Sequence, residues 1–211
     1  MQLIGMLDSP FVRRVAISLQ LLGLPFEHRP ISIFRSVAEF QKINPLVKAP
    51  TLVCDDGTVL MDSTLILQYA EALVRPRTLM PAELPELQRA QRIIGLALVA
   101  CEKGAQIIYE RDLRPPEKIH APWIERVTSQ LIAAFSALGK EIPGRPHPLK
   151  SSNITQPYLT TAVAWYFIQR MLPGIVDPGR FPALVELSEE AEALAQFRAA
   201  PYGDSTYRQG G

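Results

Sequence analysis

Apolar and polar positions along residues 1–75 follow periods that predict a small α/β unit. Short apolar runs at 2–6 and 26–31 are typical of strands, and residues 10–22 between them repeat apolar side chains at helical spacing. A short helix is expected at 37–43 and a longer one at 63–73. Residues 51–54 and 58–61 flank Asp55-Asp56-Gly57, a strong hairpin signal. The predicted order is βαβαββα, with one parallel strand pair and an antiparallel hairpin in a mixed sheet.

The remainder of the chain reads as entirely helical. Residues 76–85 contain Pro76, Pro81 and Pro85 without sustained periodicity, which is typical of a linker. Beyond it, helical spacing predicts helices at 87–101, 123–138, 157–172 and 183–199. The third of these is apolar almost all round, so we expect it to be the buried central helix. The sequence therefore predicts an α/β domain at 1–75 and an all-α domain at 86–211.

Composition excludes several classes of protein. The chain is 47% hydrophobic with a net charge of +1, so it offers no electrostatic case for binding nucleic acid or an anionic membrane. Its most apolar run, 93–101, is too short for a bilayer, and the first residues lack a charged leader, which favours a cytoplasmic location. Cys54, Cys101 and the three histidines are scattered without metal-ligand spacing, so we expect neither a metal site nor dithiol chemistry.

Ser9 is the first candidate for chemistry. Ser9-Pro10 places a strong capping residue before proline at the first helical position, and capping alone is the commoner role of such a serine. A capping hydroxyl nevertheless keeps its own proton, which a thiolate at the helix start could accept. A charge-assisted hydrogen bond of roughly 1.5–3 kcal/mol lowers a thiol pKa by about one to two units. Ser9 would then be a hydrogen-bond donor and not a nucleophile.

Two further segments lie at element boundaries. Lys48-Ala49-Pro50 precedes the third strand, and only about 5–6% of X–Pro bonds are cis, so a trans proline is the default. If the bond is cis, the Ala49 amide and carbonyl can pair with an extended peptide. Asp62-Ser63 opens a helix; capping is the usual role, but the first-turn amides can also bind a carboxylate and Asp62 an ammonium group. Together with Ser9, these segments suit a small anionic thiol peptide.

The order and spacing of these motifs resemble a known family. The matching segments are Ser9-Pro10-Phe11-Val12-Arg13-Arg14-Val15, Gly23-Leu24-Pro25-Phe26-Glu27, Asn44-Pro45, Lys48-Ala49-Pro50-Thr51-Leu52 and Asp62-Ser63-Thr64-Leu65-Ile66-Leu67-Gln68-Tyr69. They closely resemble the N-terminal half of cytosolic glutathione S-transferases, nearest to bacterial and plant tau-like members with serine in Ser-Pro-Phe. The resemblance implies a thioredoxin-like N-terminal domain followed by an all-helical C-terminal domain.

The same resemblance implies roles for individual residues. Ser9 corresponds to the catalytic hydroxyl that activates the thiol of glutathione, the co-substrate. The implied substrate-binding residues are Phe11 and Arg13 beside Ser9; Lys48 near the glycyl carboxylate; Ala49 and the cis-proline Pro50 at the cysteinyl backbone; Asp62 and Ser63 at the γ-glutamyl end; and Tyr109 in the wall of the electrophile pocket. Arg13 could alternatively be a solvated arginine, and Asp62 is one methylene shorter than the glutamate of many members.

The function implied by the resemblance is a homodimeric glutathione transferase that conjugates the thiolate to a hydrophobic electrophile, without a metal. One alternative is a catalytically silent binding or regulatory protein that keeps the fold. Another is a glutathione-dependent oxidoreductase of glutaredoxin type, which needs a cysteine where this chain has Ser9.

Overall fold

The computed structural model describes residues 1–203 of the 211. The chain forms two compact units: residues 1–79 together with the described residues from 193 onward, and residues 80–192. Within residues 1–203, no helix combines the length and apolar composition needed to cross a bilayer.

The first unit contains a four-stranded mixed sheet. Its elements in chain order are β1 (Gln2–Ile4), α1 (Pro10–Leu21), β2 (Glu27–Arg29), α2 (Val37–Ile43), β3 (Thr51–Val53), β4 (Val59–Leu60) and α3 (Ser63–Leu73). The strand order is β2-β1-β3-β4. β1 runs parallel to β2, with Leu3 opposite His28, and antiparallel to β3, with Leu3 opposite Leu52. The predicted βαβαββα order and mixed sheet are confirmed.

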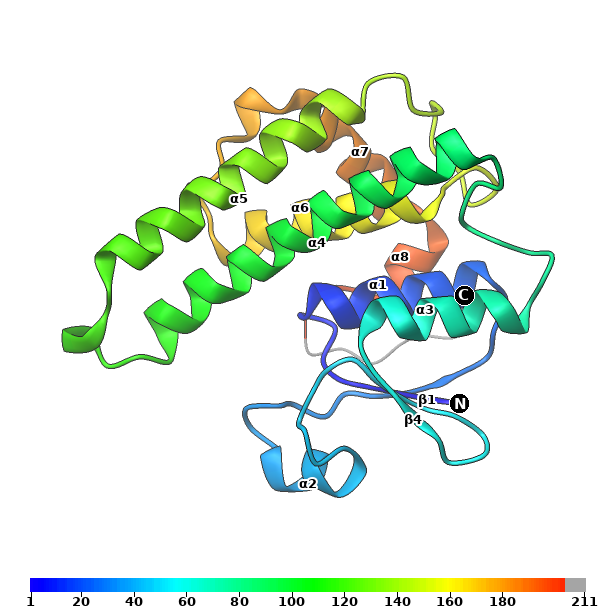
Figure 1. Cartoon of the computed structure of the whole chain (residues 1–211), viewed down its shortest axis with the longest axis horizontal. Helices are drawn as coiled ribbons and strands as arrows, with labels where there is room; N and C mark the ends of the chain where they lie inside the picture. Colours follow the sequence, from blue (N-terminus) through cyan, green and yellow to red (C-terminus); the bar gives the residue numbers. More distant parts are fainter. Residues whose placement is uncertain (204–211) are drawn as a thin grey trace. The chain divides into compact units, whose positions relative to one another are not determined.

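Helices cover both faces of this sheet. α1 and α3 pack on each other on one side of the strands, and α2 lies on the other side (Figure 1). Ile4 of β1 and Phe40 of α2 are fully buried and share a cluster with Ile31. Val47 and Ala49 pack against that cluster, so the segment before β3 is anchored to the core on the α2 side of the sheet.

The second unit is helical, as predicted. Its long helices are α4 (Leu84–Asp112), α5 (Ala121–Glu141), α6 (Gln156–Met171) and α7 (Pro182–Glu192), with short 3-10 turns η1 (Pro116–Lys118) and η2 (Pro178–Arg180). α6 packs on α4 and α7 and is buried along most of its length, which confirms it as the central helix. Trp165 of α6 is 3% exposed and meets Phe135 of α5 edge to face, with ring centroids 5.2 Å apart.

Two helices differ from the sequence prediction. α4 continues to Asp112, well beyond the predicted end at 101. The single helix predicted at 183–199 is two helices, α7 and α8 (Ala195–Ala199), and α8 packs on α1 in the first unit. The predicted domain 86–211 therefore includes a segment that belongs to the first compact unit, and its residues 204–211 lie outside the described range.

Candidate functional site

The first turn of α1 carries Ser9 as its N-cap. The Ser9 backbone is extended at φ −73° and ψ 121°, and the Val12 amide donates to Ser9 Oγ at 3.4 Å. Pro10 follows at the first helical position, where its missing N–H removes no helical bond. A serine hydroxyl that accepts from the backbone retains its own proton, so Ser9 can donate to a group at the positive end of the helix.

Gly5 brings the segment before β3 against this turn. Its φ is +134°, a conformation that favours glycine. A Cβ there would lie 2.7 Å from Val12 Cγ2 and 3.1 Å from Ala49 Cβ. Only a residue without a side chain lets α1 and Ala49 approach so closely. The Ala49–Pro50 peptide is cis, as the resemblance implies.

His28 of β2 supports the same glycine from the neighbouring strand. Its Nε2 donates to the Gly5 carbonyl at 2.7 Å. Burial lowers the pKa of His28 below its ordinary value of 6.5, and the bond to Gly5 opposes this only in part. The lowered pKa favours the neutral imidazole, and in the bond to the Gly5 carbonyl Nε2 carries the proton.

Asn44 holds the turn that leads to Ala49, a role not predicted from the sequence. The side chain is 2% exposed. Its Nδ2 donates to Thr51 Oγ1 at 2.8 Å, and its Oδ1 accepts from the Leu46 amide at 3.0 Å. Thr51 in turn donates its hydroxyl to the Lys48 carbonyl at 2.5 Å. Asn44-Pro45 is one of the segments that resemble the family, but nothing local in the sequence pattern indicates a buried amide.

The N-terminus of α3 forms the third part of the site. Asp62 is the N-cap, and its Oδ1 accepts from the Thr64 amide at 2.9 Å and from the Leu65 amide at 3.5 Å. Ser63 follows with 2% exposure, and its Oγ accepts from Arg14 Nη1 at 3.1 Å. Since Arg14 lies on α1, this bond ties the start of α3 to the helix that begins at Ser9.

Comparison with known proteins decides the family. Residues 3–78 match the family described as "Glutathione S-transferase, N-terminal domain". Glutathione S-transferase 1 of Dianthus caryophyllus is 32% identical, over 94% of this chain and 90% of that protein. The chain belongs to the glutathione S-transferase family. A zeta-class glutathione S-transferase of Euphorbia esula is 29% identical, over 89% of this chain and 83% of that protein.

The fold of one solved structure matches that of the transferase over nearly its whole length. The crystal structure of a glutathione S-transferase from Methylobacterium radiotolerans, in complex with glutathione sulfonate, has a TM-score of 0.85 and 26% identity and covers 96% of this chain and 95% of that one. The thioredoxin-like and helical architecture is thereby confirmed. The serine-type, tau-like subtype stays a prediction.

The two adjacent arginines of the transferase have different surroundings. Arg13 is 1% exposed, so the solvated alternative is wrong. Its Nε donates to the Ala200 carbonyl at 2.9 Å, and its guanidinium lies over the Phe197 ring at 5.6 Å from the centroid. These contacts direct Arg13 to α8 and the residue after it. Arg14, which the sequence did not single out, is the arginine that reaches the predicted site.

The other predicted residues lie in less constrained positions. Phe11 is half-buried in the first turn of α1, and Lys48 is exposed immediately before Ala49. Tyr109 is 43% exposed on α4 and belongs to the second unit. The structure thus brings together the start of α1, Ala49 and the start of α3, and their roles toward a ligand stay predictions.

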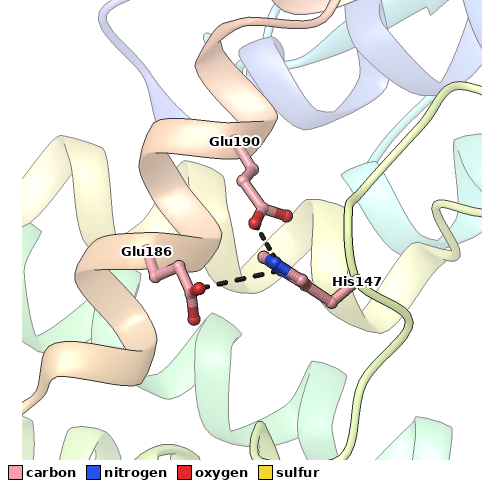
Figure 2. A group of neighbouring side chains, drawn as sticks. All are labelled: His147, Glu186 and Glu190. Atoms are coloured by element: carbon pink, nitrogen blue, oxygen red, sulfur yellow. Dashed lines mark ion pairs between the residues drawn. The ribbon is translucent and has the colours of Figure 1, made fainter.

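A separate cluster in the second unit resembles a metal site in composition. His147 Nδ1 lies 2.7 Å from Glu190 Oε1 and 3.7 Å from Glu186 Oε1 (Figure 2). Arg145 is already paired with both carboxylates, at 2.8 Å to Glu190 and 3.4 Å to Glu186. The Leu149 amide also donates to Glu190 at 2.8 Å. The Arg145 guanidinium occupies both carboxylates and would compete with a metal ion for them. We therefore interpret the cluster as a structural contact between the loop before α6 and helix α7.

Proposed function

We propose that this transferase conjugates the thiolate of glutathione to a hydrophobic electrophile, with the Ser9 hydroxyl donating a hydrogen bond to the sulfur. The observation that carries the proposal is the Ser9 cap: its Oγ accepts from the Val12 amide, and its own proton remains available at the positive end of α1. Orienting the sulfur and lowering its pKa would supply the rate gain.

The rest of the tripeptide has matching groups nearby in the first unit. We propose that the Ala49 backbone pairs with the cysteinyl residue, and that Asp62 and Ser63 bind the γ-glutamyl end. Asp62 uses Oδ1 for capping, and a carboxylate has a second oxygen that can accept from an ammonium group. Arg14, which contacts Ser63, lies five residues after Ser9, about 7.5 Å along the helix axis. A tripeptide can bridge that separation.

The proposed assignment also includes Phe11, Lys48, Pro50 and Tyr109, whereas Arg13 is left out because its contacts are with Phe197 and Ala200. Lys48 is exposed beside Ala49, where it can reach the glycyl carboxylate. Since exposed ion pairs contribute about 1 kcal/mol or less, we expect Lys48→Ala to raise the KM for glutathione by about fivefold at most. Tyr109 is proposed for the second substrate, so Tyr109→Ala should raise the KM for the electrophile more than that for glutathione.

Titration of bound glutathione tests the role of Ser9. The ultraviolet absorbance of the thiolate is followed against pH in the parent, in Ser9→Ala and in Ser36→Ala. Ser36 is a matched control because it is also an N-cap serine in the first unit, with no side-chain capping bond of its own. We expect Ser9→Ala to raise the pKa of the bound thiol by about one to two units and Ser36→Ala to leave it unchanged. An equal pKa in the parent and Ser9→Ala contradicts the proposal.

The same proteins separate catalysis from simple binding. Conjugation of a panel of apolar electrophiles is measured with the parent and Ser9→Ala. Tight binding of glutathione by the parent with no turnover on any electrophile would favour the catalytically silent alternative.

We also propose that the transferase is a homodimer. Leu65, Tyr69 and Leu73 recur every four residues along α3 and are 55%, 36% and 48% exposed. An exposed apolar ridge of this kind favours contact with a second copy. Sedimentation equilibrium should give twice the chain mass for the parent and a lower mass for Leu73→Glu. A monomeric parent would contradict this proposal. The cytoplasmic location stays a prediction.

A further inference from the structure

Met61 connects two segments of the candidate site through a single side chain. It is half-buried and immediately precedes Asp62, the N-cap of α3. Its Sδ accepts a hydrogen bond from Asn44 Nδ2 at 3.4 Å. Asn44 holds the turn that leads to Ala49. One contact between a thioether and an amide therefore joins the segment proposed for the cysteinyl residue to the segment proposed for the γ-glutamyl end.

The Asn44 amide has little freedom to adapt to a change at this sulfur. The residue is 2% exposed. The same Nδ2 also donates to Thr51 Oγ1 at 2.8 Å, and Oδ1 accepts from the Leu46 amide at 3.0 Å. A rotation of the amide toward a new acceptor would break both of these bonds. A chemical change at Met61 must therefore be accommodated by movement of Met61 and of the residues next to it.

An oxygen on the Met61 sulfur does not fit against this amide. A thioether is a weak hydrogen-bond acceptor, whereas a sulfoxide is polar and carries a strongly accepting oxygen. An N–H···O hydrogen bond needs about 2.9 Å between nitrogen and oxygen. Only 3.4 Å separates Nδ2 from Sδ, so an oxygen placed between the two atoms would clash with the amide. An oxygen on the other side of the sulfur leaves a partly positive sulfur facing the N–H. Both sulfoxide epimers therefore push the residue before Asp62 away from Asn44.

We propose that Met61 is an oxidation site through which hydrogen peroxide lowers the affinity of the transferase for glutathione. The sulfur attacks one peroxide oxygen, so that an S–O bond forms and the O–O bond breaks. The leaving hydroxide takes the proton of the transferred oxygen and becomes water, so the sulfur is oxidised to the sulfoxide and the peroxide is reduced. Displacement of Met61 changes the spacing between Ala49 and Asp62, which must hold one tripeptide together. The proposal rests on the proposed binding of glutathione by this transferase.

Calorimetry with glutathione before and after treatment with hydrogen peroxide tests this role. The proteins are the parent, Met61→Leu and the control Met171→Leu. Met171 is a suitable control because it is 37% exposed on α6 in the second unit, and is therefore open to the same oxidant. Each treated sample is incubated with dithiothreitol, which reduces disulfides and sulfenic acids of cysteine but leaves methionine sulfoxide, and is then dialysed. Mass spectrometry of peptides measures the oxidised fraction at each methionine.

Oxidation of Met61 should weaken the binding of glutathione by the parent and by Met171→Leu about fivefold or more, and methionine sulfoxide reductase should restore it. Met61→Leu keeps a similar apolar volume without a sulfur, so its affinity should stay within about twofold of the untreated parent both before and after peroxide. Three results would each overturn the role of Met61: no oxidation of Met61 when Met171 is fully converted, unchanged affinity after Met61 is oxidised, or an equal loss in Met61→Leu.

Met61→Gln keeps the experiment decisive if peroxide unfolds the parent, which urea unfolding of each sample detects. Glutamine places a polar oxygen next to Asn44 without any oxidant, so it should weaken the binding of glutathione about threefold or more relative to Met61→Leu. Equal binding by these two variants again overturns the role. Failure of the untreated parent to bind glutathione at millimolar concentration would contradict the proposed function itself, whereas binding that is insensitive to oxidation of Met61 contradicts only the oxidation site.

Discussion

Replacing Asn44 with alanine tests how the Ala49 segment is held in place. The amide is 2% exposed and connects three neighbours: the Leu46 amide, Thr51 Oγ1 and Met61 Sδ. Asn44→Ala removes these contacts and leaves no side-chain group to replace them. The loss falls on the short segment that precedes the Ala49–Pro50 bond.

The expected cost follows from the exposure of each partner. A net hydrogen bond contributes about 0.5–1.5 kcal/mol, and a buried polar group left without a partner costs about 1–3 kcal/mol. Leu46 is 70% exposed, so water can reach its surroundings, whereas Thr51 is fully buried. The Thr51 hydroxyl therefore bears most of the cost: it loses its buried donor, although it keeps its own bond to the Lys48 carbonyl. We expect Asn44→Ala to lower the free energy of unfolding by about 2–3 kcal/mol, or the Tm by about 4–12 °C.

Urea unfolding and glutathione binding measure this effect together. Thr51→Val is the matched variant, because it removes the hydroxyl that Asn44 contacts and keeps the branched shape. The double variant should be destabilised by less than the sum of the single changes, since both remove one bond. Glutathione affinity should fall in Asn44→Ala even at temperatures where the protein is folded. A loss of stability below about 1 kcal/mol, or full additivity with Thr51→Val, would refute the reasoning.

Further predictions concern packing and pH. Gly104→Ala would place a Cβ 2.2 Å from Ile168 Cδ1 and should lower the free energy of unfolding by about 1–3 kcal/mol. Gly95→Ala on the same helix would place a Cβ with nothing within 4 Å and should raise the free energy of unfolding by about 0.5–1 kcal/mol. Urea unfolding measures both. The pKa of His28 is lower in the folded chain than its unfolded value of 6.5, so the free energy of unfolding decreases as the pH falls below that value. His28→Gln should reduce this decrease between pH 7 and pH 5, as measured by urea unfolding at each pH. Arg13→Met should lower the unfolding free energy by about 1.5–3 kcal/mol.

Much of the first unit could be predicted because its signals are local. Asp55-Asp56-Gly57 indicates a hairpin without reference to the rest of the chain, and the structure has Gly57 at φ +85° between β3 and β4. Ser9 and Asp62 are typical N-caps, and both accept from amides of the first turn. These capping residues also predict the N-termini of α1 and α3, which form part of the candidate site.

The end of α4 and the break between α7 and α8 could not be predicted in this way. Residues 102–112 include polar and charged side chains at most positions, so apolar periodicity fades although the helix continues. Residues 193–195 contain neither glycine nor proline, and the chain still leaves the helix before Leu194. The cause is tertiary: Phe197 is fully buried in the first unit, against Arg13. Burial of one aromatic side chain outweighs the local preference for a continuous helix.

Arg13 and Arg14 show why residue type and position alone do not identify a functional side chain. Successive residues of a helix point about 100° apart, so identical neighbours face different partners. α1 is packed on both sides, by α8 and by α3, and each arginine is buried against one of them. Which of the two arginines faces α3 depends on where α8 packs. The sequence pattern predicts residues 195–199 as part of a continuous helix in the other domain, so it does not reveal this contact. Arg13 bonds to the residue that follows α8, whereas Arg14 bonds to Ser63 and Thr64 at the start of α3, where the γ-glutamyl end of glutathione is proposed to bind.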